Sequence, residues 1–397
     1  MSKTPIVVLG DIAQFIRGIN FKPDDVVPLG TEGSVACMRT KNVQSELDLT
    51  DVWAVAEGFV RREEQLLQAG DILVSSANSW NLVGKCSWIP ELPWRASFGG
   101  FVSVLRANPA HVDARFLYQW FAWEHTQALL RSFGQKTTNI SNLNIDRALA
   151  LKLPLPPVEE QRRIAAILDQ AETLRTQRRT ALALLDSLTQ SLFLDMFGDL
   201  ATNPKRFQAK SLCEVATFYG GNSLPSGLDF TDQVGGYFLM KVSDMNLPGN
   251  EREILQCQSW SDVAGSKAST CPVGSIVVPK RGGAIGTNKK RITTRPTVLD
   301  PNLMAICPDP DQLNQEFLFQ WFLGFDLASI ASGSSVPQLN KQDLAPLTML
   351  VPPLPLQQTF ATRIASIQAL KATHRRALAA LDALFASLQQ RAFAGQL

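Results

Sequence analysis

The chain has 397 residues, of which 45% are hydrophobic and 19% charged, and its formal net charge is +2. This composition is typical of a folded globular protein with room for two or three domains, and it excludes an intrinsically disordered chain. The small net charge permits contact with nucleic acid without demanding it.

The sequence shows neither a secretory signal nor a membrane span. The N-terminal segment MSKTPIVVLGDIAQF has one lysine and a short apolar run that Asp11 interrupts, and no uncharged apolar stretch reaches the length of a membrane-spanning helix. The six cysteines are scattered with no C-x-x-C pair. This favours buried or idle thiols in a reducing compartment over disulfides or zinc ligands. We therefore expect a cytoplasmic protein without membrane contact.

In chain order, the first half begins with a mixed α/β block. Short apolar runs at 71–77 and 101–107 predict strands. Asp113 is a good helix N-cap, and the helix predicted after it ends near Gly134. Its paired aromatic residues have the i, i+1, i+4, i+5 spacing of one helix face, so we expect them to pack in a core rather than to stack on a ligand.

A long heptad helix follows the Pro156–Pro157 pair. From about 158 to 197 there is no glycine or proline, and a line of mainly apolar residues recurs at alternating steps of three and four. This is the 3.5-residue repeat of a coiled-coil seam, which a helix cannot bury by itself. The predicted seam residues include Ile164, Ile167, Leu174, Arg178, Leu185, Leu188 and Leu192.

The second half repeats this plan. Strands are predicted at 275–279 and 302–307, and a helix capped by Asn314 is predicted to end near Gly333. The Pro352–Pro353 pair then precedes a second heptad helix. Its predicted seam residues include Phe360, Ile367, Leu370, His374, Leu381, Leu384 and Leu388.

The two halves are copies of one module. Residues 143–198 align with 339–394 at a constant offset of 196 residues, and upstream matches have offsets of 201 and 204, which indicates loops of different length. Because each long helix has a duplicate, we expect the two to pair as an antiparallel coiled coil. Arg178 and His374 share a heptad position near the helix midpoints, and they are predicted either to form one polar layer or to extend separately to solvent. The alternative, in which each helix packs on its neighbouring block, fits the regular seam less well.

Motifs for catalysis are absent from the sequence. It contains no G-x-x-x-x-G-K-[ST] phosphate loop, no G-x-S-x-G elbow and no Asn/Asp-Pro-Pro-Tyr tetrapeptide of a DNA adenine methyltransferase. The histidines, His111, His125 and His374, stand at no metal-ligand spacing from a cysteine or carboxylate. We therefore expect a non-enzyme that holds neither metal nor cofactor.

Basic and amide-rich loops recur at corresponding places in the two halves. Residues 280–295 hold six Lys or Arg side chains and no acidic residue. Arg, Lys, Asn and Gln read guanine and adenine edges in the major groove, and Ser, Thr and Lys hold phosphates. One such loop is more often plain solvated surface, but recurrence at matched places favours nucleic-acid binding.

In the first half the candidate DNA-binding residues are Arg39, Lys41, Asn42, Ser76, Asn78, Trp80, Lys85, Lys136, Thr137, Asn139 and Asn142. In the second half they are Lys241, Ser243, Lys280, Arg281, Lys289, Lys290, Arg291, Ser334, Gln338 and Lys341. We expect Lys289, Lys290 and Arg291 to hold phosphates, and Lys280 and Arg281 to reach bases.

A boundary motif stands at the start of both long helices. It reads LKLPLPPVEEQ at 151–161 and LTMLVPPLPLQ at 347–357. A variable block, this boundary and a heptad helix, all repeated, resemble over the whole chain the specificity subunit of type I restriction–modification systems. The second copy departs from the Pro-x-x-Glu-Gln form of that family, because Leu356 precedes Gln357.

The resemblance implies an α+β chain in which two α/β target recognition domains are joined by two long helices that form an antiparallel coiled coil. The implied bounds are 1–153 and 199–350 for the recognition domains, and 154–198 and 351–397 for the spacer helices. Each domain would read one half of a bipartite, asymmetric site in double-stranded DNA.

The resemblance also implies partners. Two modification subunits would dock on the coil and bring S-adenosylmethionine and adenine methylation, and a restriction subunit would bring ATP- and Mg-dependent cleavage. No cofactor is implied for this chain itself. The alternative that the sequence leaves open is a non-catalytic coiled-coil scaffold or regulatory protein whose blocks bind a partner other than DNA.

Overall fold

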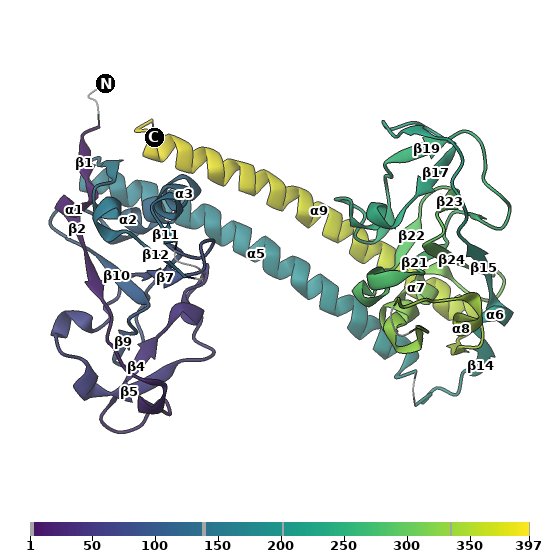
Figure 1. The fold of residues 1–397 in the computed structure, drawn as a ribbon, viewed down its shortest axis with the longest axis horizontal. Helices are drawn as coiled ribbons and strands as arrows, with labels where there is room; N and C mark the ends of the chain where they lie inside the picture. Colours follow the sequence, from purple (N-terminus) through teal and green to yellow (C-terminus); the bar gives the residue numbers. More distant parts are fainter. Residues whose placement is uncertain (1–3, 137–139, 201, 334–335, 397) are drawn as a thin grey trace. The chain divides into compact units, whose positions relative to one another are not determined.

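The computed structural model describes residues 4–136, 140–200, 202–333 and 336–396. The chain divides into two compact units: unit 1 comprises residues 1–179 and 376–397, and unit 2 comprises residues 180–375. Each unit contains a body of strands and short helices together with part of each long helix (Figure 1).

Two four-stranded sheets form the main part of the unit-1 body. The strands of unit 1 are β1 (Ile6–Val8), β2 (Ala13–Arg17), β3 (Val26–Val27), β4 (Ser34–Met38), β5 (Trp53–Ala56), β6 (Ile72–Ser75), β7 (Ala77–Asn78), β8 (Cys86–Trp88), β9 (Ala96–Phe98), β10 (Val102–Ala107), β11 (Gln135–Lys136), β12 (Ser141–Asn142) and β13 (Lys152–Pro154). The sheets have the orders β2-β10-β6-β8 and β3-β5-β4-β9, and smaller pairings join β1 to β13 and β11-β12-β7. The helices of the body are α1 (Leu9–Ile12), α2 (Ala114–Phe121), α3 (Glu124–Ser132) and α4 (Ile145–Leu149), with 3₁₀ turns η1 (Pro23–Asp25), η2 (Thr40–Asn42), η3 (Glu57–Phe59) and η4 (Glu63–Gln65).

The predicted strands and the predicted helix start of the first half are confirmed. β6 and β10 lie where the apolar runs place them, and the Asp113 carboxylate accepts hydrogen bonds from two backbone N–H groups at the start of α2. The prediction of one helix to Gly134 is wrong, because α2 ends at Phe121 and α3 begins at Glu124. The buried side chain of Gln127 donates to the carbonyl of Phe121 at 2.8 Å, which satisfies a backbone group that the break leaves open.

The unit-2 body repeats this plan. Its strands are β14 (Gln208–Ser211), β15 (Ala216–Gly220), β16 (Leu228–Asp229), β17 (Tyr237–Met240), β18 (Glu253–Ile254), β19 (Ser259–Ser261), β20 (Thr270–Cys271), β21 (Ile276–Pro279), β22 (Arg291–Thr293), β23 (Thr297–Leu299), β24 (Leu303–Pro308) and β25 (Thr348–Val351). The sheet orders β15-β24-β21-β22-β18 and β16-β19-β17-β23-β20 contain the two orders of unit 1, and β14 pairs with β25 as β1 does with β13. The helices are α6 (Leu212–Val215), α7 (Gln315–Leu323) and α8 (Lys341–Leu344), with 3₁₀ turns η5 (Val242–Asn246), η6 (Gly282–Thr287) and η7 (Leu327–Ile330).

The predicted strands of the second half are confirmed as β21 and β24, and Asn314 caps α7 as predicted. The predicted end near Gly333 is wrong, because α7 stops at Leu323 and Gly324 is its C-cap. The aromatic faces of α2 and α7 pack in cores as expected: Phe116 and Phe317, for example, are fully buried.

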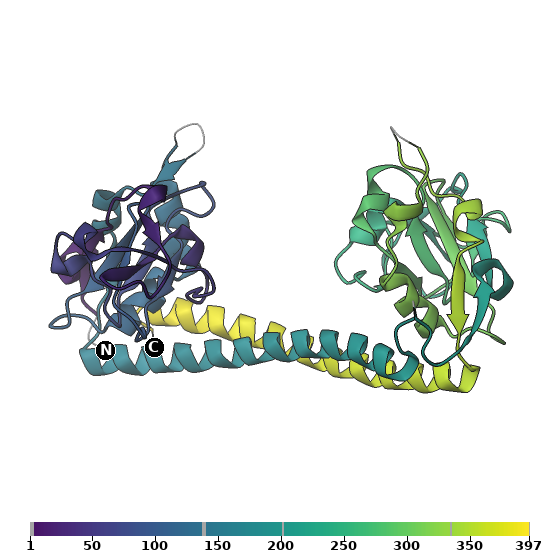
Figure 2. The same ribbon diagram turned by 90° about the horizontal axis from the view of Figure 1, so that it is seen from below.

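The two long helices have the predicted lengths: α5 spans Val158–Phe197 and α9 spans Leu354–Phe393. In unit 1, the start of α5 at Ile164 shares a core with Phe393 at the end of α9. In unit 2, Phe197 at the end of α5 contacts Phe360 near the start of α9, with ring centroids 5.3 Å apart. Within each unit the two helical segments therefore run antiparallel, and Figure 2 shows them side by side.

An equivalent ion pair joins the helical segments in each unit. In unit 1, Arg175 of α5 donates to Asp382 of α9 at 2.6 Å, and in unit 2, Lys371 of α9 donates to Asp186 of α5 at 2.6 Å. Arg175 and Lys371 are 196 residues apart, as are the two aspartates. The Lys371 side chain is only 5% exposed, so losing its aspartate would leave a buried charge without its partner.

The seam differs from the predicted one at every second position. Ile164 and Ile367 are buried as predicted, but Leu174 and Leu188 are 40% and 47% exposed. The inward positions lie one residue later: Leu168 is fully buried, and 175, 182 and 189 are partly buried. The second helix shows the same shift, since its leucines at 370 and 384 are 46% and 50% exposed. The inward set is apolar at Leu168 but includes Arg175 and Lys371, which form the ion pairs between the helical segments of each unit.

A buried glutamine fixes each body to its long helix. In unit 1, Gln161 accepts a hydrogen bond from the backbone N–H of Asp113 at 2.8 Å and donates to the carbonyl of Pro156 at 2.8 Å. In unit 2, Gln357 accepts from the N–H of Asn314 at 2.7 Å and donates to the equivalent proline carbonyl at 2.7 Å. The departure of the second boundary motif from the family form therefore changes neither the helix start nor this contact.

Candidate nucleic-acid interface

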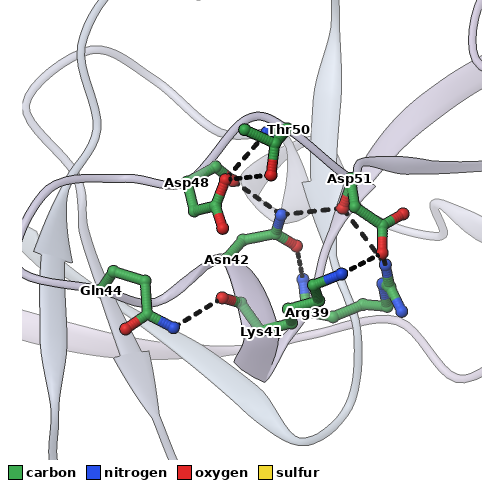
Figure 3. A network of polar contacts seen from close by, with 7 residues as sticks. All are labelled: Arg39, Lys41, Asn42, Gln44, Asp48, Thr50 and Asp51. Atoms are coloured by element: carbon green, nitrogen blue, oxygen red, sulfur yellow. Dashed lines mark hydrogen bonds and ion pairs between the residues drawn. The ribbon is translucent and has the colours of Figure 1, made fainter. Parts of the chain in front are cut away.

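The candidate loops are numbered in chain order within each unit: the first is 39–51 or 241–246, the second 75–85 or 280–295, and the third 135–144 or 334–341. The first loop of unit 1 is folded around a buried amide. Asn42 is fully buried; its Oδ1 accepts from the backbone N–H of Arg39 at 2.7 Å, and its Nδ2 donates to the carbonyls of Asp48 at 2.7 Å and Asp51 at 3.1 Å (Figure 3). Lys41 and Arg39 pair with the Asp51 carboxylate at 2.7 and 3.1 Å, and these hydrogen bonds hold the pKa of Asp51 below its usual value. The network fixes the shape of residues 39–51.

The three predicted DNA-contacting residues of this loop differ in how accessible their side chains are. Asn42 is committed to the loop, because a buried amide must be hydrogen-bonded, and the expectation that it contacts DNA is wrong. The guanidinium of Arg39 lies 3.5 Å from the centroid of the Trp53 ring, and its side chain is 19% exposed. Lys41 is 58% exposed and presents its ammonium at the surface.

Unit 2 builds the same turn around an acid. The backbone N–H of Lys241 donates to Asp244 at 2.7 Å, and Asp244 also accepts from the N–H of Gln258 at 3.1 Å. Asp244 is fully buried, and this burial raises its pKa. Lys241 and Ser243 are exposed on the turn, as a contact with DNA requires.

A lysine–amide hydrogen bond joins the first and second loops in both units. Lys85 donates to the side-chain oxygen of Gln44, and Lys289 donates to that of Asn246. The two lysines are equivalent residues at an offset of 204. The two loops of each unit are thus held on one surface by the same kind of contact.

Backbone pairing brings the third loop beside the second. In unit 1, β7 pairs with β12, with Ala77 opposite Asn142, and in unit 2 an isolated bridge joins Arg281 to Gln338. In unit 1 the paired strands β11 and β12 lie at the end of the body away from the long helices (Figure 2). The predicted residues that the pairing gathers are Ser76, Asn78 and Asn142 in unit 1, and Lys280, Arg281 and Gln338 in unit 2.

Two residues of the basic run point inward. Lys290 is 2% exposed, its Nζ donates to Asn288 and to the carbonyl of Phe325 at 2.7 Å each, and burial lowers its pKa to about 8. Arg291 donates to the carbonyls of Lys290 and Met245 at 2.8 and 3.0 Å. The expectation of a phosphate contact is therefore wrong for Lys290, whose ammonium binds the backbone just after α7.

Three of the remaining candidates lie within the described residues. Trp80 is 49% exposed, and Lys341 is exposed with its Nζ 5.7 Å from the centroid of the Phe218 ring. Lys136 ends strand β11. Thr137, Asn139 and Ser334 lie outside the described residues.

Phe101 and Asn302 belong to the same surface of their respective units, although neither was predicted from the sequence. Both stand at the tip of a turn that hydrogen-bonds the second loop: the Phe101 carbonyl accepts from the N–H of Ser76 at 3.1 Å, and the Asn302 carbonyl accepts from the N–H of Lys280 at 2.6 Å. The two residues are equivalent at an offset of 201. That equivalence was the available signal, but each side chain alone is of an ordinary type.

Across the described parts of the chain, no group of three His, Cys, Asp or Glu side chains could hold a metal ion, and no helix is long and apolar enough to cross a membrane. A cleft of 1230 Å³ lies in unit 2 beside α7 and the long helices. Its charged lining residues include Glu251, Arg252, Glu316, Lys371 and Arg375. These charges are of mixed sign, and they include the ion pairs Arg252–Glu316 and Lys371–Asp186.

Several known proteins are similar to this chain. Residues 5–183 match the model of the type I restriction modification DNA specificity domain. The chain is 26% identical over 256 residues to the type I restriction enzyme StySPI specificity subunit of Salmonella potsdam, covering 63% of this chain and 52% of that protein. It is also 26% identical over 195 residues to the EcoKI specificity subunit of Escherichia coli strain K12, covering 47% and 39%.

The fold is shared with a solved relative. The type-I restriction-modification system S subunit from M. genitalium superposes with a TM-score of 0.60 at 14% identity, covering 98% of this chain and 96% of that one. The chain spans about half the length, or less, of the two curated relatives. These relatives are specificity subunits and not catalytic subunits, in agreement with the lack of catalytic motifs in the sequence. Residues 5–183 thus match the DNA specificity domain of type I restriction–modification systems, and the chain is similar to specificity subunits of these systems.

Proposed function

We propose that the chain is the DNA-reading subunit of a type I restriction–modification complex, in which the body of each unit reads one half of a bipartite, asymmetric site. The main observation in support of this proposal is that both units contain the same arrangement of surface loops. Both units hold their loops together through the same lysine–amide bond and the same backbone turn, yet display different side chains. Loops that share a backbone arrangement but carry different side chains in the two units are suited to reading two different half-sites.

The long helices are proposed to form one antiparallel coiled coil that sets the distance between the half-sites. The antiparallel helical segments within each unit, and the duplicated Arg175–Asp382 and Lys371–Asp186 ion pairs, support this arrangement. The recognition domains would then span 1–153 and 199–350.

Two modification subunits are proposed to dock on the helices. Unit 1 exposes Leu174 and Leu384, and unit 2 exposes their duplicates Leu370 and Leu188, all between 40% and 50% exposed. Exposed leucines that recur at matched heptad positions are typical of a helix-binding face. Methyl transfer, with its S-adenosylmethionine, and cleavage, with its ATP and Mg, would take place in the partner subunits.

The experiment is a DNA-binding assay on the full chain assembled with its modification subunits. Arg281→Ala should weaken binding through the second half-site only, whereas Lys267→Ala, which removes an exposed lysine of unit 2 outside the three loops, should leave binding unchanged. Lys289→Ala, which removes an expected phosphate contact, should lower the slope of log K against log salt by about 0.9. A complex that binds all duplexes equally would contradict the proposed function.

A further inference from the structure

The strongest unassigned feature is a rigid turn that presents an exposed aromatic side chain in unit 1. Gly99–Val102 forms a β-turn closed by the N–H of Val102 and the carbonyl of Gly99 at 2.9 Å, and Phe101 occupies its third position. The N–H of Gly99 donates to the carbonyl of Met38 at 2.9 Å. A Cβ on Gly100 would collide with the side chain of Asn20, so the turn is packed from below.

Phe101 is held in place but not covered. Its carbonyl accepts from the N–H groups of Ser76 and Ala77, both at 3.1 Å, which ties the turn to the second loop. Its side chain is nevertheless 65% exposed. An aromatic side chain that is fixed by its backbone and left in water is typical of a contact surface, because burial by a partner recovers the apolar free energy.

Unit 2 contains the same turn with a different tip. The N–H of Leu303 donates to the carbonyl of Asp300 at 3.0 Å, and the carbonyl of Asn302 accepts from the N–H of Lys280 at 2.6 Å. Asn302 is exposed at the position of Phe101. Both units therefore contain the same backbone turn, and the side chain at its tip is the apolar Phe101 in unit 1 and the amide Asn302 in unit 2.

The neighbours of Phe101 indicate which DNA group it would meet. Asn78 and Asn142 lie in the paired strands β7 and β12, and β7 begins at Ala77, whose N–H donates to the Phe101 carbonyl. Amide side chains read adenine in the major groove, where the only apolar group on a base edge is the 5-methyl of thymine, and phenylalanine is one of the side chains that contact it.

We propose that Phe101 recognises the 5-methyl group of a thymine in the first half-site, and that Asn302 contacts a base edge by hydrogen bonds at the equivalent place in the second. This inference rests on the proposed function, because it assumes that the loops of each body face the major groove.

The test replaces each thymine of the first half-site in turn by deoxyuridine, which lacks only the methyl group. With the full chain assembled with its modification subunits, one position should raise Kd by about fourfold, the factor expected for one methyl-sized apolar contact. Phe101→Ala should weaken binding to the thymine duplex by a similar factor and remove the difference between thymine and deoxyuridine. Phe101→Leu, which keeps an apolar tip, should retain part of that difference.

Ile6→Ala is the matched control, because Ile6 is 68% exposed but lies on β1, beside β13 and outside the three loops. It should keep the full discrimination. A wild-type complex that tolerates deoxyuridine at every position, or a Phe101→Ala complex with the same discrimination as wild type, would overturn the inference. Failure of the proposed function gives a different result, namely no sequence-specific binding by any variant.

Discussion

Replacing the buried glutamine at the start of each long helix tests how the bodies are held. Gln161→Met conserves volume but removes both hydrogen bonds, leaving the N–H of Asp113 and the carbonyl of Pro156 without partners at a site that is 1% exposed. Each buried group left unsatisfied costs about 1–3 kcal/mol, so the free energy of unfolding of unit 1 should fall by about 2–6 kcal/mol. Gln357→Met should cost unit 2 at least as much, because Gln357 also donates to the carbonyl of Gln312 at 3.1 Å.

Hydrogen–deuterium exchange read by mass spectrometry is the suitable assay, because it reports each unit separately. Gln161→Met should lower the protection of α2 and leave α7 unchanged, and Gln357→Met should do the reverse. The controls are Gln170→Met and Gln358→Met, which alter exposed glutamines on the same helices and should change stability by less than about 0.5 kcal/mol. If the buried and exposed substitutions had equal effects, the reasoning would be refuted.

Three further predictions address the seam, the buried lysine and the duplication. Leu168→Ala should destabilise unit 1 by about 2–5 kcal/mol and Leu174→Ala by less than 1, as measured by chemical denaturation; the opposite order would restore the originally predicted seam. Because burial lowers the pKa of Lys290 from 10.5 to about 8, the unfolded chain binds more protons between these values, so stability should rise with pH across that window and should do so less in Lys290→Met. Residues 1–198 alone carry one unpaired helix and should form a twofold dimer that directs methylation of a palindromic, interrupted site; a monomer by sedimentation would argue against the paired-helix spacer.

The sequence predicted the elements whose signal is local. The helices α5 and α9 follow from forty residues with little or no helix-breaking sequence, and the caps at Asp113 and Asn314 follow from residue type. The positions that face the opposite helix could not be predicted from the sequence. Leu168, which is buried, and Leu174, which is exposed, are both apolar, and their burial depends on the opposite helix. The early ends of the two aromatic helices likewise depend on side chains from elsewhere in the body.

The candidate site was predicted as a set of loops and not as a set of atoms. The loops could be identified because similar polar and basic residues occur at corresponding positions in the two halves of the sequence. It could not show that Asn42 and Lys290 point inward, because their partners lie in the surrounding backbone. The sequence gives Phe101 no residue-type signal, because an aromatic residue beside a strand usually belongs to a core, whereas in the structure its side chain is 65% exposed.

The central claim is tested most directly by single-molecule methylome sequencing of a host that expresses this chain with its modification subunit, against a host that expresses the modification subunit alone. We expect a new adenine methylation pattern at an asymmetric site of two short half-sites separated by a fixed gap, with Arg281→Ala affecting the second half-site only. An unchanged methylome, or methylation at one continuous sequence, would contradict it.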